Sequence, residues 1–312
     1  MRRHIPSTQA LACFEAAARH ESYTRAAQEL ALTQSAVSRQ ILALEDQLGV
    51  QLFRRTRHGV SLTPAGRHYS QQVARWLRGL ERDTLDVMAH QGHGGSLSLA
   101  AVPTFATRWL IPRLPLLAQE HPDIMVHIET QTRPFLFSDT SFDAALYAGT
   151  PEQVANWPGV QVQLLMQEDV VPVCSPRLLE QAAPRARGRA HQPVSPKAIA
   201  HLPLLQQSTR PYGWRQWFDA MGVDAPRALD GPRYELFSMI AVAATMGLGV
   251  ALMPPMLIEA EMERGDLVIA CGRPLRGERA YYLVTPAQPA SPVLTAFSEW
   301  LGAMAGARTN PD

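Results

Sequence analysis

Ser35, Ser38 and Arg39 recur on one side of a short helical pattern, and their side chains can reach the base edges and phosphates of a DNA duplex. Thr33 stands where the N-cap of this helix belongs, and Gln34 opens the helix. We therefore expect these five residues to bind DNA when the helix lies in a major groove. The alternative is an ordinary polar face that only water contacts.

Two helical patterns separated by a tight connection position these side chains. Residues 24–48 read TRAAQELALTQSAVSRQILALEDQL, with the connection at Ala31 and Leu32. In the second helix, apolar residues at helical spacing lie opposite the hydroxyls and face a core: Val37, Ile41, Leu44 and Leu48. Gly49 then closes the helix. The order helix, turn and helix is typical of DNA-binding modules, although the pattern is short.

A basic hairpin is expected next. Residues 50–63, VQLFRRTRHGVSLT, place a basic cluster between two apolar segments, which indicates a two-stranded wing. Arginines at the tip of such a wing can bind phosphates, and these contacts position a protein on the duplex without reading its sequence. The arginines concerned are Arg54, Arg55 and Arg57.

A long helix is predicted from Thr63 to about residue 90, because a threonine cap followed by Pro64 is a strong helix start. One helix alone cannot bury the apolar stripe that runs along it. We expect two copies of the chain to pair as a homodimer through Tyr69, Val73, Trp76 and Leu80. The alternative is that the helix folds back on its own chain. Residues 91–95, QGHGG, are expected to form a flexible connector.

From Ser96 onward the pattern changes to strands that alternate with helices, which predicts an α/β body. Such alternation implies a mainly parallel sheet covered on both faces. The expected strands are 97–101, 124–130, 142–147, 170–174 and 250–253, and the expected helices are 110–117, 214–221 and 236–246.

In sheets of this kind a ligand binds beyond the C-terminal strand ends, where helix N-termini present free N–H groups. That position falls on Pro103, Thr104 and Phe105, directly after the first strand. Thr104 is the first choice for an effector contact, although a threonine before a helix is more often only a cap. Facing contacts are expected from Tyr147, Gly149, Gln207, Ser208, Arg210, Phe237 and Ser238. Arg210 can pair with an effector carboxylate or form an ordinary surface ion pair.

Charge is distributed unevenly along the chain. Residues 1–90 hold 12 arginines and 8 acidic residues, whereas the remainder holds 17 basic and 20 acidic residues. A basic head on a mildly acidic body suits a DNA-binding module attached to another domain. Cys13, Cys174 and Cys271 are far apart without metal spacing, so we interpret them as packing residues. Since no export signal or membrane-spanning segment is found, a cytoplasmic location is expected.

No metal, cofactor or catalytic activity is expected. His90 and His93 lie beside glycines and are interpreted as polar linker residues rather than metal ligands. Gly247 and Gly249 begin a possible dinucleotide motif, but Leu252 stands where the third glycine is required. Walker A, GxSxG, HExxH and CxxC motifs are all missing from the sequence, which argues against an enzyme.

Residues 11–66 resemble the winged helix-turn-helix of LysR-type bacterial transcriptional regulators, because TQSAVSRQI, LGVQLF and LTPAG occur in this order. The resemblance continues more loosely to about residue 305. It implies a multidomain chain with an all-α winged helix-turn-helix domain, a linker helix and a two-lobed α/β effector-binding domain similar to periplasmic binding proteins. The boundaries are expected at 1–62, 63–90 and 96–312, with lobe one formed by 96–162 and 273–305 and lobe two by 163–272.

The resemblance also implies a function. Such a regulator would bind promoter or operator DNA as a homodimer or homotetramer and respond to a small effector, which we expect to be anionic. LysR-type regulators commonly hold the effector with a hydroxyl residue at the turn where Thr104 lies. Contact with RNA polymerase is expected if the chain is an activator. The alternatives are an architectural DNA-binding protein without an effector and a small-molecule enzyme with a DNA-binding head.

Overall fold

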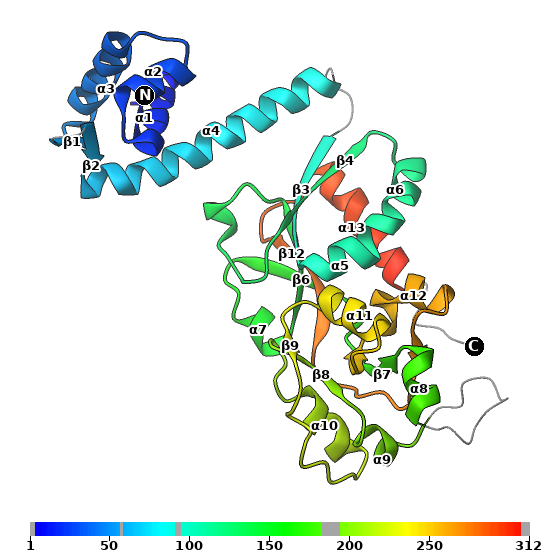
Figure 1. Cartoon of the computed structure of the whole chain (residues 1–312). Helices are drawn as coiled ribbons and strands as arrows, with labels where there is room; N and C mark the ends of the chain where they lie inside the picture. Colours follow the sequence, from blue (N-terminus) through cyan, green and yellow to red (C-terminus); the bar gives the residue numbers. More distant parts are fainter. Residues whose placement is uncertain (1–3, 57–58, 91–94, 183–193, 307–312) are drawn as a thin grey trace. The chain divides into compact units, whose positions relative to one another are not determined.

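The computed structural model describes residues 4–56, 59–90, 95–182 and 194–306. It forms two compact units, residues 1–93 and 94–312, here called the head and the body (Figure 1). No helix among the described residues is long and apolar enough to cross a lipid bilayer. Arg57 and positions 91–94 of the expected connector lie outside the described residues, and Gly95 already belongs to the first strand of the body.

The head contains α1 (Thr8–His20), α2 (Tyr23–Glu29), α3 (Gln34–Leu48), β1 (Phe53–Thr56), β2 (Gly59–Leu62) and α4 (Pro64–His90). Side-chain caps explain where α1, α2 and α3 begin, because Ser7, Ser22 and Thr33 each accept a hydrogen bond from the backbone N–H three residues later. Helix α3 ends where Gly49 adopts a left-handed φ of 67°. The expected helix-turn-helix, hairpin and long helix are confirmed.

Side chains from α1, α3, α4 and the hairpin share the core of the head. Phe14 contacts the rings of Phe53 and Tyr69 at centroid distances of 5.6 and 5.5 Å. Gly66 is needed in α4 because a Cβ atom there would lie 2.1 Å from the backbone oxygen of Leu52. The expectation that Leu48 is a core residue was wrong: it is 37% exposed, because the last turn of α3 extends beyond this core.

The body contains two five-stranded sheets (Figure 1). The first has the order β4-β3-β5-β12-β6, and the second has the order β11-β7-β10-β8-β9. The strands of the first sheet are β3 (Gly95–Ala101), β4 (Ile124–Thr130), β5 (Ala144–Gly149), β6 (Val160–Gln167) and β12 (Ala280–Pro286). Those of the second are β7 (Val171–Cys174), β8 (Leu204–Gln207), β9 (Arg233–Tyr234), β10 (Val250–Met253) and β11 (Val268–Ile269).

Both sheets are mixed, so the expectation of a mainly parallel sheet was wrong. Strand β12 is antiparallel to both β5 and β6, because the chain returns from the second sheet and enters the first between these two strands. Strand β7 is antiparallel to β10 and β11. Among the described strands, parallel pairing is confined to β3 with β4 and β5, and to β8 with β9 and β10.

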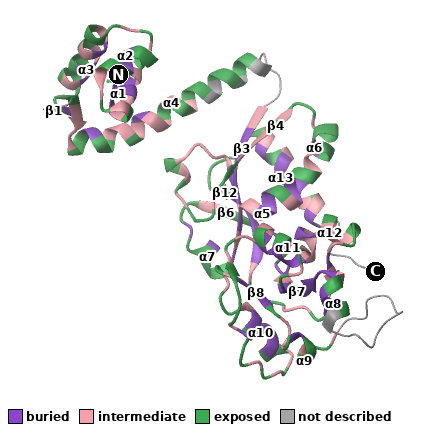
Figure 2. Ribbon diagram, viewed as in Figure 1, coloured by how far each residue is buried: buried purple, intermediate pink, exposed green. Residues whose placement is uncertain are grey.

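Helices pack against the sheets, and the sides of these helices that face away from the sheets are exposed (Figure 2). The expected helix at 110–117 is part of an irregular series that begins at Pro103 and is interrupted near Pro112 and Pro115. The series comprises α5 (Pro103–Phe105), a π-helical turn (Ala106–Leu110), a 3₁₀ turn (Ile111–Arg113) and α6 (Leu114–Glu120). The remaining helices are α7 (Pro151–Ala155), α8 (Pro176–Ala182), α9 (Pro196–Ile199), α10 (Gly213–Ala220), α11 (Phe237–Thr245), α12 (Glu259–Glu263) and α13 (Pro292–Gly306), with 3₁₀ turns at Phe137–Asp139 and Pro255–Leu257.

The two lobes built on these sheets share one hydrophobic core, which includes Phe105 and Trp109 from the first lobe and Ile240 from the second. Ion pairs also join them, with Arg108 to Glu261 at 2.5 Å and Arg113 to Glu259 at 3.0 Å. The chain leaves the first lobe after Gln167, because β6 continues to that residue within the first sheet. The crossing expected at residue 163 was therefore placed too early.

The three cysteines are buried and free, as expected for packing residues. Burial raises the pKa of the Cys174 thiol to about 12, so this thiol stays protonated at neutral pH.

Candidate DNA-binding face and effector site

The start of α3 presents the polar side chains that were expected to contact DNA. Gln34, Ser35 and Arg39 are exposed, and Ser38 is half-buried. The Thr33 hydroxyl accepts a hydrogen bond from the backbone N–H of Ala36 at 3.2 Å and lies 3.1 Å from the Ser35 hydroxyl. Thr33 therefore acts first as the helix cap, while its neighbours keep their polar groups at the surface.

The hairpin adds positive charge to the head. Arg54 and Arg55 are exposed on β1, and the Arg54 Nε atom donates a hydrogen bond to the Ser61 hydroxyl across the hairpin at 2.9 Å. This contact holds the Arg54 side chain against β2, whereas Arg55 is exposed in the same strand, paired in register with Val60.

The apolar stripe of α4 divides into two parts. Val73 is fully buried in the head and Tyr69 packs against Phe14, so the expectation that Val73 contacts a second copy was wrong. The cause is the wrapping of the first turns of α4 against α1. Trp76 and Leu80 are 54% and 52% exposed, and Val87 and, at the edge, Met88 continue this exposed side of the helix.

Thr104 lies at the junction of the two lobes and is 6% exposed. Its hydroxyl oxygen accepts a hydrogen bond from the backbone N–H of Ser238, in the first turn of α11, at 3.3 Å. A cavity of about 350 Å³ opens beside it, here called the first compartment. Seven of the residues expected at the effector site line this cavity: Pro103, Thr104, Phe105, Tyr147, Gln207, Arg210 and Phe237.

The other three expected residues lie close by without lining the cavity. Ser238 contributes its backbone N–H to Thr104, and the Ser208 N–H donates to the Tyr234 carbonyl at 2.9 Å as part of the second sheet. Gly149 lies beneath Tyr147, where a Cβ atom would come within 2.4 Å of the ring. Gly149 therefore permits the Tyr147 side chain to adopt its position at the compartment.

The buried carboxylate of Glu168 forms an ion pair with the Arg210 guanidinium. The Arg210 Nε and Nη2 atoms donate to the two Glu168 oxygens at 2.6 and 2.5 Å, and the Glu168 side chain is only 2% exposed. Arg279 donates to the same carboxylate at 3.3 Å and to the Ala148 carbonyl at 2.9 Å. Arg210 thus forms an ion pair, which was one of the two expectations for this residue. The pair is buried between the lobes, however, and not at the surface.

Sequence reasoning missed Glu168, Arg279 and Tyr281, which together surround Arg210. Tyr281 is buried and hydrogen-bonded to Glu168, and its pKa is raised well above the usual value, first by burial and then by this carboxylate. Burial followed by the charge of Arg210 lowers the pKa of Arg279. Two sequence signals could have pointed to this cluster: the charged residue Glu168 directly after β6, and the charged residue Arg279 directly before β12.

The charges in this cluster do not cancel. Two guanidinium groups, of Arg210 and Arg279, share the one carboxylate of Glu168, and both guanidiniums line the first compartment. Glu168 does not line that compartment, whereas the exposed side chains of Arg133 and Glu235 do, so three guanidiniums and one carboxylate line it. An anion that enters beside Thr104 would therefore meet two partly desolvated cations and a hydroxyl.

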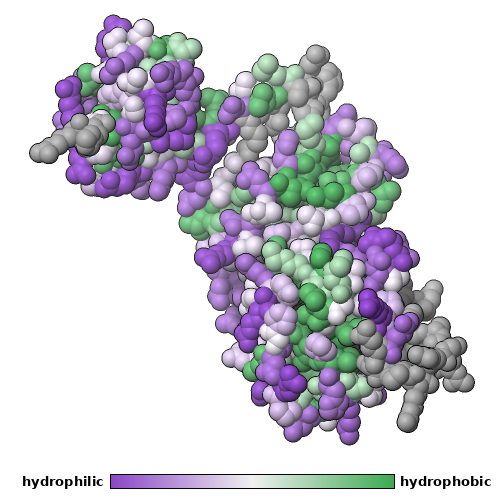
Figure 3. All heavy atoms as spheres, viewed as in Figure 1, coloured by the Kyte–Doolittle hydropathy of each residue, from purple (hydrophilic) through white to green (hydrophobic). Residues whose placement is uncertain are grey.

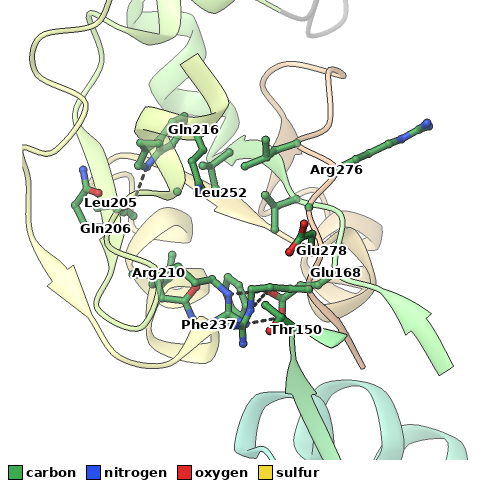
Figure 4. A pocket seen from close by; sticks show the side chains of 18 residues that line it. Thr150, Glu168, Leu205, Gln206, Arg210, Gln216, Phe237, Leu252, Arg276 and Glu278 are labelled. Atoms are coloured by element: carbon green, nitrogen blue, oxygen red, sulfur yellow. Dashed lines mark hydrogen bonds and ion pairs between the residues drawn. The ribbon is translucent and has the colours of Figure 1, made fainter. Parts of the chain in front are cut away.

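A second cavity of about 520 Å³, here called the second compartment, shares part of its lining with the first (Figure 4). Gln207, Arg210, Phe237 and Arg279 line both compartments. The residues that line only the second are Thr150, Glu168, Val170, Leu205, Gln206, Gly213, Trp214, Gln216, Ile240, Leu252, Leu275, Arg276, Gly277 and Glu278. Among the described residues, no three His, Cys, Asp or Glu side chains gather so that they could hold a metal ion.

Two family profiles match the chain. The one described as "LysR substrate binding domain" covers residues 90–306, and the one described as "Bacterial regulatory helix-turn-helix protein, lysR family" covers residues 8–67. The chain is 35% identical over 308 residues to the glycine cleavage system transcriptional activator of Escherichia coli K12, covering 98% of this chain and 96% of that protein. It is 34% identical over 293 residues to the transcriptional activator AmpR of Rhodobacter capsulatus, covering 94% and 95%.

Solved structures share the same architecture. Full-length CbnR in complex with its target DNA matches with a TM-score of 0.66 and 20% identity, covering 96% of this chain and 99% of CbnR. The effector domain of AmpR from Pseudomonas aeruginosa matches with a TM-score of 0.57 and 24% identity, covering 68% of this chain and 96% of the domain. At these identities the likeness establishes the fold.

Proposed function

The chain belongs to the LysR family of DNA-binding bacterial transcriptional regulators, which are not enzymes, and we propose that its effector is a small anion held in the first compartment. The observation that carries this proposal is the charge of the compartment, where Arg210 and Arg279 share a single carboxylate. A carboxylate or similar anion beside them would compensate the remaining positive charge in a region of low dielectric.

Thr104 supplies the second contact in this proposal. Because its oxygen already accepts the N–H of Ser238, the hydroxyl proton is free to be donated to the effector. An effector at this position would touch the first lobe through Thr104 and act on α11 of the second lobe through Ser238. Effector binding would then change the equilibrium between two arrangements of the chain only if its contacts differ between them.

In the head, we propose that the exposed start of α3 reads base edges while Arg54 and Arg55 bind phosphates. The exposed positions of Gln34, Ser35 and Arg39 support this division. The role of Arg57 is proposed from its sequence position alone.

Self-association is the next part of the proposal. Trp76, Leu80, Val87 and Met88 leave an apolar stripe exposed on α4, which suits pairing with the same helix of a second copy. The body also exposes Met239, Val242 and Met246 along α11, with Leu248 just after it, and apolar side chains gather on the body face shown in Figure 3. Two separate apolar surfaces support a homodimer that pairs into a homotetramer.

The relatives named activators support a contact with RNA polymerase at a promoter. A regulator that binds chromosomal DNA must act in the bacterial cytoplasm, and we place the chain there as part of the same proposal.

Two measurements on the purified full-length chain test the proposal. The first compares its affinity for duplexes from upstream of its own and adjacent genes with that for random duplex at moderate salt; a clear preference is expected, and equal affinities would refute regulation through these sites. The second records the melting temperature with a panel of small carboxylates and matched neutral amides. A ligand that binds only the folded state must raise the melting temperature. A rise with a neutral amide and none with any carboxylate would refute the anionic effector.

A further inference from the structure

Glu45 lies near the C-terminal end of α3, and its side chain contacts the start of the hairpin. The Oε1 atom of Glu45 accepts hydrogen bonds from the backbone N–H groups of Leu52 at 2.6 Å and of Phe53 at 2.9 Å. The main-chain oxygen of Glu45 also accepts the N–H of Gly49 and, at 3.2 Å, the N–H of Val50. One residue therefore closes α3 and holds the segment that follows it.

Within the described residues of the hairpin, other bonds leave these two N–H groups without a backbone partner. Thr63 donates to the Leu52 carbonyl at 2.9 Å, but its own carbonyl accepts the N–H of Arg67 in α4 at 2.9 Å. Phe53 is the next residue along, and because bonded and non-bonded pairs alternate in an antiparallel ladder, its N–H is directed away from β2. Without the Glu45 carboxylate, two partly buried N–H groups would lose their acceptor.

Two kinds of contact hold the start of β1. The Phe53 side chain is buried in the core of the head, where its ring lies 5.4 Å from the ring of Tyr23. That contact fixes a side chain, whereas the bonds to Glu45 fix two successive peptide groups relative to α3. Arg54 and Arg55 follow directly in the strand, so the orientation of these peptide groups determines where the two guanidiniums lie.

We propose that Glu45 is a positioning residue for DNA binding, whose carboxylate keeps the arginines of the hairpin in a fixed relation to the start of α3. The proposal rests on the phosphate contacts proposed above for Arg54 and Arg55. One continuous helix joins Gln34 to Glu45, so base reading and phosphate binding are held in one register. This role differs in sign from simple electrostatics, because a carboxylate near DNA repels phosphates and its removal alone would strengthen binding.

The test measures the affinity of the full-length chain for specific and random duplexes by fluorescence anisotropy at several salt concentrations. Glu45→Ala should weaken binding to both duplexes about tenfold at moderate salt and lower the slope of log affinity against log salt by about one unit, because one phosphate contact is lost. A head that is only less stable would have a smaller active fraction and an unchanged slope. Glu45→Gln keeps an acceptor oxygen and should restore the slope.

Asp46→Ala is the matched control. It removes the same charge from the neighbouring exposed position of α3, and among the described residues its side chain makes no hydrogen bond to the hairpin, so DNA affinity should stay unchanged or rise slightly. Hydrogen exchange of residues 50–56, followed by mass spectrometry, should become faster in Glu45→Ala and not in Asp46→Ala. Glu45→Asp keeps the charge on a shorter side chain, should lower the slope as well, and replaces Glu45→Ala if that variant does not unfold cooperatively.

A third comparison separates this inference from the proposed roles of the arginines. In a chain that carries Arg54→Ala and Arg55→Ala, adding Glu45→Ala should lower the slope no further. If the two arginine changes leave the slope unaltered, the proposed phosphate contacts are wrong and the positioning role fails with them. If they lower it, but Glu45→Ala binds as the unmodified chain does or has the same effect without the arginines, the positioning role alone is overturned.

Discussion

The Thr104 hydroxyl accepts a hydrogen bond from the backbone N–H of Ser238 at 3.3 Å, although the two residues are 134 positions apart in the sequence. This bond connects the turn after β3 in the first lobe with the first turn of α11 in the second. A ligand that binds the Thr104 hydroxyl therefore acts directly on the helix whose outer face exposes Met239, Val242 and Met246. The proposed effector compartment and a candidate surface for self-association thus lie on two sides of one helix.

Thr104→Val keeps the shape of the side chain but removes this acceptor. We expect a loss of about 1 kcal/mol in the free energy of unfolding, because the partly buried Ser238 N–H loses its partner. The change in DNA binding on effector addition should disappear, while DNA affinity without effector stays the same. Urea unfolding and DNA titrations measure both. Thr107→Val, one turn later and exposed, is the control and should retain the response; a full response in Thr104→Val would contradict the role given to the hydroxyl.

Glu168→Gln removes the carboxylate from between Arg210 and Arg279. The free energy of unfolding should fall by about 3–5 kcal/mol, because two desolvated guanidiniums lose their counter-charge. Asp230→Asn is the comparison, because it breaks an exposed ion pair with Arg227. The Arg227 and Asp230 side chains are 82% and 61% exposed, so this change should lower the free energy of unfolding by less than about 1 kcal/mol. Chemical denaturation followed by circular dichroism measures both values, and similar small losses would show that the buried pair contributes little.

We propose that the head separates base reading from phosphate binding. Ser38→Ala and Arg39→Ala should reduce discrimination between specific and random duplex, since one base contact supplies about 1–3 kcal/mol. Arg55→Ala should weaken binding to all duplexes and lower the slope of log affinity against log salt by about one unit. Fluorescence anisotropy at several salt concentrations distinguishes the two effects. Equal losses of specific and non-specific binding in all three variants would contradict the assigned roles.

The exposed half of the α4 stripe should control dimerisation. Trp76→Glu combined with Leu80→Glu places two charges on the proposed contact between copies, so sedimentation should show monomers at concentrations where the unmodified chain is dimeric. Gln71→Glu adds a charge at an exposed polar position of the same helix and should leave the dimer intact. If the double variant sediments as the unmodified chain does, pairing occurs through another surface.

Glu29 gives the head a defined response to acid. Hydrogen bonds from Arg19 and then His20 lower the pKa of its carboxyl to about 2, from an ordinary value of 4.5. A lowered folded-state pKa stabilises the fold above the unfolded-state value, so this contribution is complete above about pH 5 and is lost as pH falls from 4.5 toward 2. The difference in melting temperature between the unmodified chain and Glu29→Gln should therefore be constant at neutral pH and shrink below pH 4.5. Asp46→Asn, exposed in α3, serves as the control.

Local rules in the sequence determined most of the head. Caps at Ser7 and Thr33, the glycine after α3, and the apolar spacing of Val37, Ile41 and Leu44 depend only on residues within a few positions of one another. The same kind of information located Thr104 at the start of a helix after a strand. These features were predictable because hydrogen bonding and side-chain periodicity within one element do not require knowledge of the rest of the fold.

Contacts between distant segments were decided only by the tertiary structure. The antiparallel entry of β12, the burial of Val73 against α1, and the pairing of Arg210 with Glu168, 42 residues earlier, each join elements whose relative positions no local pattern specifies. Burial then gives such contacts their importance, because a charge that is exposed in an isolated segment becomes costly to leave unpaired once two lobes close around it. The sequence alone thus located the turn that bears the hydroxyl proposed to contact the effector, whereas packing of the lobes determined which charges surround it.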